Sequence, residues 1–255
     1  MSPSIWTQCA ERFEPARLAG PAWRAVESQH VTSTRKLVDS DDEQQLLEAL
    51  IDTAKPPWPV GRRFAALHYL LATPFRHPPL RYGSRFGTRR ERGIFYCAET
   101  QGTVLAEKAY YVLLFLEGTE ADIAPLTRPL TLFQVRISTR KGVDLTAEPF
   151  AGFTDDVSSP TTYRVSQPLG SEMREAGVAA FRFQSARDPG KGANLGLFEP
   201  VFTTKKPLHA EQWICTASRA CVELQPGPAV IRARTSFARE TFEVDGVFPT
   251  PGASA

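Results

Sequence analysis

The apolar and polar positions of the chain follow a helical spacing in the first half and a mostly alternating spacing in the second. Apolar residues at 46, 47, 50 and 51 share one face of a helix. Ser40, with Glu43 three positions later, forms a capping box in front of that face. The prolines at 56, 57 and 59 stop the pattern. We therefore predict a helix that begins after Ser40 and ends before Pro56.

A second helix is predicted from Thr103 to Glu117, and Gly118 fits the C′ position that follows a helix. Residues 65–72, which run up to Pro74, fit a helix or a strand, and residues 148–163 resemble a loop. Short strands are expected over residues 93–98, 130–137, 177–183, 195–202, 212–217, 220–224 and 229–233. Helices early in the chain and strands late in it indicate the α+β class.

The length of 255 residues suits one large domain or two small ones. We find no internal repeat in the sequence. We expect a partly helical N-terminal extension over residues 1–60, packed on a main domain over 61–248, and a disordered tail over 249–255.

The composition excludes several classes of protein. Hydrophobic residues make up 42% and charged residues 23%, which rules out a disordered chain, a collagen and a long coiled coil. The longest apolar run, Ala109 to Leu116, has eight residues, whereas a membrane helix needs roughly 20. The first twelve residues contain no apolar stretch of the kind found in secretory signals. We expect a cytoplasmic protein without membrane contact.

The four cysteines and the net charge of +2 exclude few further classes of protein or ligand. None of the cysteines has the CxxC spacing that structural zinc sites use, so we expect no metal and reduced thiols. The charge is uneven, however. Between Gly61 and Arg92 there are eight arginines, one acid and no lysine. Arginine binds phosphate through two parallel hydrogen bonds, so the segment favours an anionic ligand or partner. The alternative is a solvated basic face with some arginines in structural ion pairs.

Glu107 is the carboxylate with the most unusual position. It lies one turn into an otherwise apolar predicted helix, so it either reaches water at the helix edge or is directed into a site. An acid near a helix N-terminus is also favourable for purely structural reasons. Two further stretches are polar and contain glycine, namely residues 74–86 and 183–194. Each alone is a weak signal, and the second is also consistent with an ordinary surface loop.

Three stretches taken together resemble the RES domain family. They are GSRF, FYCAETQGTVLAE and FQSARDPGKGANLGLF, in this order, and the resemblance covers about residues 64–206. It implies an ADP-ribosyltransferase-like fold, with a split β-sheet core and flanking helices. It also implies the toxin half of a bacterial type II toxin–antitoxin pair that consumes NAD⁺ by hydrolysis or phosphorolysis. Modification of a protein with ADP-ribose is the alternative activity.

The resemblance also implies a partner. An Xre-type helical antitoxin would block the NAD⁺ pocket and form a hetero-oligomer with this chain, and nucleic acid would be contacted only through the antitoxin. NAD⁺ would be a substrate rather than a cofactor, and no Rossmann fingerprint G-x-G-x-x-G occurs in the sequence. We therefore expect no cofactor.

The family's pattern assigns the site residues. Arg85, Tyr96, Glu107 and Ser185 match its glycine-adjacent arginine, strand aromatic, glutamate and serine. Glu107 would stabilise the oxocarbenium-like ribose that forms when nicotinamide leaves. Ser185 would orient the ribose, and Tyr96 would pack on the nicotinamide ring.

Further residues complete the predicted substrate site. Arg76 matches an early arginine that would share the two phosphates with Arg85. His77 follows it where many relatives have tyrosine, and Tyr82 is the alternative ring. Arg187 is a candidate for a second anion site together with Arg81, and Asn194 lies beyond the serine in the same motif.

Two other functions remain open on the sequence alone. The arginine run suits a nucleic-acid-binding or RNA-cleaving toxin, although no RNA-binding motif accompanies it. A non-catalytic interaction domain would gain support if Glu107 were buried and paired with an arginine away from any pocket.

Overall fold

Five strands close into a ring at the centre of the protein. The computed structural model describes residues 3–28, 38–59, 61–79, 81–120, 125–228 and 233–251. Neighbours in the ring pair in the order β1 (Ala16–Glu27), β2 (Phe95–Ala98), β5 (Ala193–Leu197), β4 (Ala180–Gln184) and β3 (Leu126–Asp144). β1 also pairs with β3 from Ala16 to Glu27, which completes the circle. β3 and β4 run parallel, and the other pairs are antiparallel.

A second part of the same eight-stranded sheet continues from β3, which is 19 residues long. The first part of β3 pairs with β6 (Leu208–Ala217), followed by β7 (Cys221–Pro226) and β8 (Thr235–Ala238). In β7 the buried and exposed positions alternate, as expected of a strand with one face on the core. β5, in contrast, is buried at every position because both of its faces are covered.

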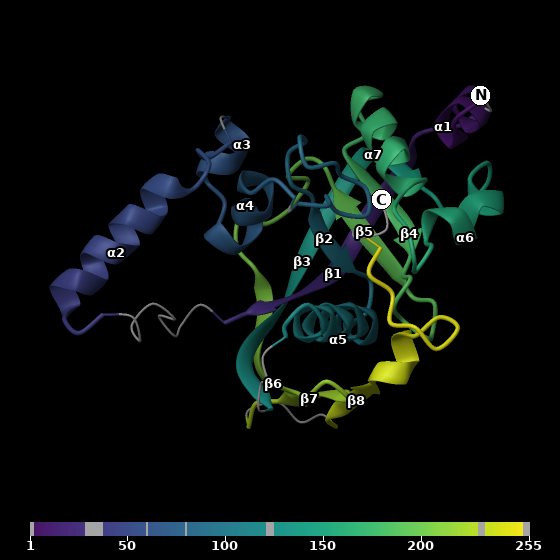
Figure 1. Cartoon of the computed structure of the whole chain (residues 1–255). Helices are drawn as coiled ribbons and strands as arrows, with labels where there is room; N and C mark the ends of the chain where they lie inside the picture. The colour runs from purple at the N-terminus through teal and green to yellow at the C-terminus, as the bar shows by residue number, and fades with distance from the viewer. Residues whose placement is uncertain are drawn as a thin grey trace.

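Helix α5 (Gln101–Glu117) lies between the two parts of the sheet, in contact with β1 and β2 on one side and β7 on the other (Figure 1). Its sequence is apolar on nearly every face, which suits a helix covered on several sides. Tyr110 is fully buried, stacks on Phe248 with ring centroids 5.3 Å apart, and donates a hydrogen bond of 2.7 Å to the Pro249 carbonyl. Burying each large apolar side chain contributes about 1.5–3 kcal/mol, so this helix anchors the core.

The remaining described helices are short or peripheral. They are α1 (Ile5–Cys9), α2 (Asp41–Ala54), α3 (Arg62–Ala65), α4 (Tyr69–Arg76), α6 (Thr154–Val157) and α7 (Ser166–Glu175), with 3-10 turns at Ala10–Arg12, Ala151–Phe153 and Arg239–Phe242. None of the described helices is both long and apolar enough to cross a membrane. The four cysteines are free thiols.

Several sequence predictions are confirmed. The α+β class is correct, and α2 has both hydrogen bonds of the predicted capping box between Ser40 and Glu43. The six predicted strands between residues 93 and 224 correspond to β2 through β7, with shifted ends. The predicted helix from Thr103 begins at Gln101, because Thr100 is the residue that caps it.

Other predictions are wrong in detail. Gly118 has a φ of −76° and is the C-cap residue rather than a left-handed C′ glycine. The strand predicted to reach residue 202 ends at Leu197, and residues 148–163 include a 3-10 turn and α6. α7 and β8 have no counterpart in the predictions. Residues 229–232 of the last predicted strand lie outside the described residues, and Ala233 is not in a strand.

The predicted domain limits also need correction. β1 pairs within the main sheet, so residues 16–27 are an integral strand rather than an extension packed on the domain. No residue of α2 is buried, so its apolar face is not packed either. At the other end, Pro249 and Pro251 are buried, and ordered chain therefore continues beyond residue 249. Residues 252–255 of the expected tail lie outside the described residues.

Candidate active site

Three of the predicted site residues meet at the carboxylate of Glu107. Ser185 Oγ and Asn194 Nδ2 each donate a hydrogen bond of 2.6 Å to the same oxygen, Glu107 Oε1. Among the described residues, Oε2 receives no hydrogen bond. Glu107 therefore has one oxygen fixed by the protein and one available to a ligand.

The sheet explains why these residues meet. Asn194 lies on β5, where it pairs with Ala98 of β2 on one side and Phe183 of β4 on the other. Ser185 follows the end of β4, and Glu107 faces both from the second turn of α5. Strand pairing thus sets the distance between the amide and the hydroxyl, and the packing of α5 brings the carboxylate to them.

The hydroxyl of Ser185 uses all of its hydrogen-bonding capacity. Besides donating to Glu107, its oxygen accepts the backbone N–H groups of Arg187 and Asp188, each at 3.1 Å. A hydroxyl has one donor and two acceptor positions, so its proton is directed to the carboxylate. Ser185 holds Glu107 in place and shapes the turn after β4 at the same time.

Asp188 fastens this turn to helix α5. Its Oδ2 accepts hydrogen bonds from Thr103 Oγ1 at 2.8 Å and from the Gly192 N–H at 3.2 Å, and its Oδ1 accepts the Gly190 N–H at 2.9 Å. Thr103 is one helical turn before Glu107. A Cβ on Gly192 would lie 2.1 Å from Thr103 Oγ1, so only glycine fits there. Sequence reasoning missed Asp188 and Thr103, although Asp-Pro-Gly is a turn signal.

Two buried arginines lie on either side of the segment from Val157 to Tyr163. Arg85 Nη1 donates to the carbonyls of Val157 at 3.2 Å and Ser159 at 2.8 Å. Arg187 Nη2 donates to the Pro160 carbonyl at 2.8 Å. Arg85 is 7% exposed and Arg187 is 4% exposed, and no carboxylate within the described residues forms an ion pair with either.

Arg187 in addition has a buried nitrogen, Nη1, without a hydrogen bond to any described residue. A buried charge without a counter-charge is costly, and a buried donor without an acceptor adds to that cost. Aromatic rings compensate in part. The Arg187 guanidinium lies 3.6 Å from the Tyr110 ring centroid, and that of Arg85 lies 5.1 Å from the Tyr163 centroid. The arrangement suits an anionic ligand.

Tyr110 links these charged groups, because it lies one turn after Glu107 on α5 and its ring is in contact with the Arg187 guanidinium. Burial raises the pKa of its hydroxyl, the charges of Arg187 and Arg85 lower it, and the charge of Glu107 raises it. Tyr110 therefore lies within electrostatic reach of both arginines and of the carboxylate. The hydrogen bonds connect Glu107, Ser185 and Asn194, and the Arg187 N–H joins them through Ser185 Oγ. Arg85 is the next charged group, and it acts on the same Tyr110 hydroxyl.

Tyr96 holds the turn that contains Arg85. Its hydroxyl lies 3.0 Å from Ser84 Oγ and accepts the Phe86 N–H at 3.1 Å. Burial raises the pKa of this hydroxyl to about 12. Tyr96 therefore fixes the turn on both sides of Arg85, and the structure gives this residue a contact that the sequence did not reveal.

Arg76, His77 and Tyr82 are not brought to Glu107. Arg76 Nε donates to the Pro56 carbonyl at 2.5 Å, and its guanidinium lies 3.4 Å from Asp52 Oδ1 and 4.4 Å from the Trp58 centroid. The structure thus places this arginine in the junction between α2 and α4.

His77 is the C-cap of α4, where burial and the neighbouring Arg76 and Lys55 charges lower the pKa of its imidazole. Tyr82 is 48% exposed, with Arg81 5.2 Å from its ring centroid. Within the described part of the chain, the structure shows no contact between these residues and the site. Sequence reasoning could not foresee this, because the contacts of Arg76 come from tertiary packing.

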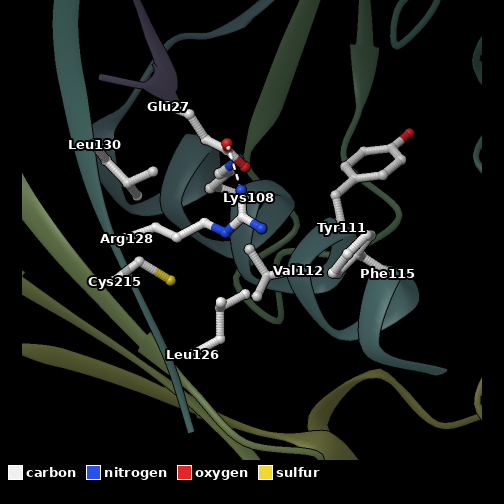
Figure 2. Close-up of a pocket in the computed structure, with 9 residues that line it drawn as sticks. All are labelled: Glu27, Lys108, Tyr111, Val112, Phe115, Leu126, Arg128, Leu130 and Cys215. Carbon is white, nitrogen blue, oxygen red and sulfur yellow. Dashed lines mark hydrogen bonds and ion pairs between the residues drawn. The ribbon is translucent and has the colours of Figure 1, made fainter. Parts of the chain in front are cut away.

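A cavity of about 120 Å³ lies on the neighbouring face of α5 (Figure 2). Glu27 contacts Lys108 at 3.7 Å and Arg128 at 3.0 Å across it, while the Tyr111 ring points away from this pair. Glu107 does not line it. Within the described residues, no group of three or more His, Cys, Asp or Glu side chains is arranged to hold a metal ion.

Comparisons with known proteins show the family of the chain. The model of the RES domain matches residues 56–218, which is more than half of the chain, and the chain therefore belongs to the RES domain family. Among solved structures, a similar one is the crystal structure of the M. tuberculosis MbcT–MbcA toxin–antitoxin complex. It has a TM-score of 0.44 and 11% sequence identity, and the match covers 94% of this chain and 96% of that one. No curated protein matches the chain.

Proposed function

We propose that this RES domain protein cleaves the bond between nicotinamide and ribose in NAD⁺, as the toxin of a toxin–antitoxin pair. The observation that carries the proposal is the carboxylate of Glu107, held at one oxygen and open at the other, beside two buried arginines that lack a counter-charge among the described residues. Membership of the RES family supports it.

The reaction needs little proton transfer. Water attacks ribose C1′, the C1′–N bond breaks, and its electron pair leaves with nicotinamide as a neutral molecule. The sugar passes through an oxocarbenium-like state, which a nearby carboxylate stabilises. Glu107 Oε2 takes this role, while Ser185 and Asn194 hold Oε1 so that the charge is already positioned. The products are ADP-ribose, nicotinamide and one proton.

Arg85 and Arg187 hold the two phosphates of NAD⁺ in this proposal. Their burial and the orphaned Nη1 of Arg187 fit a bidentate anion. This changes the assignment made from the sequence, in which Arg76 shared the phosphates with Arg85. Tyr96 contributes by fixing the turn around Arg85, in addition to any contact with the nicotinamide ring.

The acceptor of the ADP-ribose group distinguishes three versions of the same chemistry. Water gives hydrolysis, inorganic phosphate gives phosphorolysis, and a protein side chain gives ADP-ribosylation. Each breaks the same C1′–N bond, so each requires Glu107. The proposed partner is a helical antitoxin of the Xre type that forms a hetero-oligomer with the chain and blocks the site.

Release of nicotinamide from NAD⁺, measured by chromatography, tests the proposal. The reaction is run with and without phosphate, and with an added protein mixture whose labelling by ADP-ribose is followed. We expect Glu107→Gln to lower release by about 100-fold or more, since it removes the stabilising charge. Glu117→Gln is the matched control on the same helix, because that carboxylate pairs with Arg239 at 2.7 Å. Equal release by wild type and Glu107→Gln contradicts the proposal, as does the absence of release.

A further inference from the structure

A large basic groove lies on another part of the molecule. Its volume is about 820 Å³, and its lining residues come from α3, the segment before β2, the C-terminal half of β3, the end of α7 and the chain after β5. Figure 1 labels these helices and strands. We propose that this groove binds the phosphate backbone of nucleic acid without reading the bases. The proposal does not depend on NAD⁺ cleavage.

Charge is the first argument. Four cations line the groove, Arg63, Arg92, Lys141 and Arg174, against a single acid, Glu199. They come from distant parts of the chain, and two belong to the arginine run at residues 61–92, which the active site uses only through Arg85. Folding therefore gathers cations that the sequence separates. Such a concentration of one sign in a groove attracts polyanions.

Most of these cations are available to a ligand. Within the described residues, no ion pair is found for Arg63, Arg92 or Lys141, and each is exposed. Arg174 is different. It lies 3.9 Å from Glu91 and 4.2 Å from the Phe198 ring centroid, so it shapes the groove as well as charging it.

The described backbone around the groove offers no free strand edge. The Ser138 N–H donates to the Val201 carbonyl at 2.9 Å, and the Ala179 N–H donates to the Lys141 carbonyl at 2.8 Å. The Phe198 N–H donates to the Ala179 carbonyl at 2.9 Å. A peptide partner therefore has no open edge to extend as an added strand. A ligand in this groove would therefore contact side chains rather than the backbone.

The apolar part of the lining also disfavours a protein partner. Val178, Ala179 and Phe198 are buried, and Phe202 packs on Phe95 with ring centroids 4.9 Å apart. Protein interfaces usually need exposed apolar or aromatic anchors at their centre, whereas binding to a nucleic-acid backbone depends mainly on Lys and Arg. Among the described residues that line the groove, no exposed ring is present for bases to stack on, so binding is independent of base sequence.

The groove is separate from the candidate active site. Its residue Ala179 precedes β4, and Ser185 follows β4, so the two sites lie at opposite ends of one strand, about 20 Å apart at the usual rise per residue. On β3, Arg136 and Arg140 are exposed on either side of the groove residue Ser138. They extend the basic surface beyond the groove.

The test uses fluorescence anisotropy with a labelled 20-base-pair DNA duplex and a labelled 20-nucleotide thymidine strand. Three phosphate contacts, from Arg63, Arg92 and Lys141, predict that duplex affinity falls on the order of 40-fold between 50 and 200 mM salt. The double variant Arg63→Glu/Lys141→Glu retains one of these contacts, Arg92, which predicts weaker binding and a fall of only about 3- to 4-fold. Arg234→Glu is the control, since that side chain is 71% exposed and lies outside the groove. The comparison of duplex with single strand shows which form the groove prefers.

Three results would overturn the proposal. They are no binding of either probe at 50 mM salt, equal binding by the double variant and the control, and binding of poly-glutamate in place of both nucleic acids. The last result would identify an acidic polypeptide as the partner. Nicotinamide release is measured on the same variants and is expected to be unchanged, so a failure of the groove proposal and a failure of the proposed function are seen separately.

Discussion

At the scale of single residues, the candidate site depends on how Ser185 and Asn194 hold one oxygen of Glu107. Ser185 has no spare capacity, and Asn194 donates to the same oxygen of Glu107. A site of this kind is preorganised, because the carboxylate cannot rotate away without breaking two short hydrogen bonds. Preorganised charge acts without reorganisation during the reaction.

Removal of the Ser185 hydroxyl tests this arrangement. We expect Ser185→Ala to lower nicotinamide release by about 10- to 100-fold, since Glu107 loses one of two hydrogen bonds. The N–H groups of Arg187 and Asp188 also lose their acceptor, which costs about 1–3 kcal/mol in the free energy of unfolding. Steady-state kinetics and urea unfolding measure the two effects. Ser171→Ala, on α7, is the control and should change neither.

Asp188 is a positioning residue: it holds the turn that begins at Ser185 against Thr103 of α5 and does not itself contact Glu107. Asp188→Asn replaces one acceptor oxygen by an N–H₂ group, which cannot accept the hydrogen bonds of Thr103 or of the glycine N–H groups. The turn from Ser185 to Gly192 is then held less tightly against Thr103. We expect faster trypsin cleavage after Lys191 and a lower kcat with little change in KM. The exposed Asp155→Asn is the control. Unchanged cleavage together with unchanged kcat would show that the turn is held without Asp188.

At the scale of elements, α5 joins the active site to the core. Its first turns hold Thr103 and Glu107, and Tyr110 fastens the helix to the C-terminal segment through Pro249. Tyr110→Phe keeps the ring but leaves the Pro249 carbonyl without its donor, so we expect a loss of about 1–3 kcal/mol in the free energy of unfolding. Thermal or urea unfolding measures it. A loss below the error of the measurement would mean that water replaces the hydroxyl.

The elements also show which parts of the fold and the site could be predicted from the sequence. The capping box of α2 was predicted because its partners, Ser40 and Glu43, are three residues apart. Strand β1 was missed, since it contains Gly20 and Pro21 and pairs with β3 more than 100 residues later. Glu107 was singled out by its position in an apolar helix, and the family motif then assigned it a role together with Ser185 and Asn194. The contacts of Arg76 with Asp52 and Trp58 could not be predicted, because they depend on how α2 and α4 meet.

At the scale of the whole molecule, a net charge of +2 conceals two concentrations of positive charge. One is the pair of buried arginines near Glu107, and the other is the exposed groove lined by Arg63, Arg92, Lys141 and Arg174. The first pair costs stability, because buried charge without a counter-ion is unfavourable. A bound anion would supply the missing counter-charge, so the unfavourable free energy of burying these arginines is consistent with a ligand site.

Arg187→Met separates stability from ligand binding. In the free protein the variant loses one hydrogen bond to Pro160 but also removes a buried charge, so we expect the free energy of unfolding to change by less than about 1 kcal/mol or to rise. ADP-ribose at 100 times its dissociation constant should stabilise the wild type by about 2.7 kcal/mol. The variant should lose that stabilisation and most of its nicotinamide release, whereas the exposed Arg164→Met should keep both. If Arg187→Met instead unfolds about 3–5 kcal/mol more easily and still responds to ADP-ribose, then Arg187 serves the fold and the phosphates are held elsewhere.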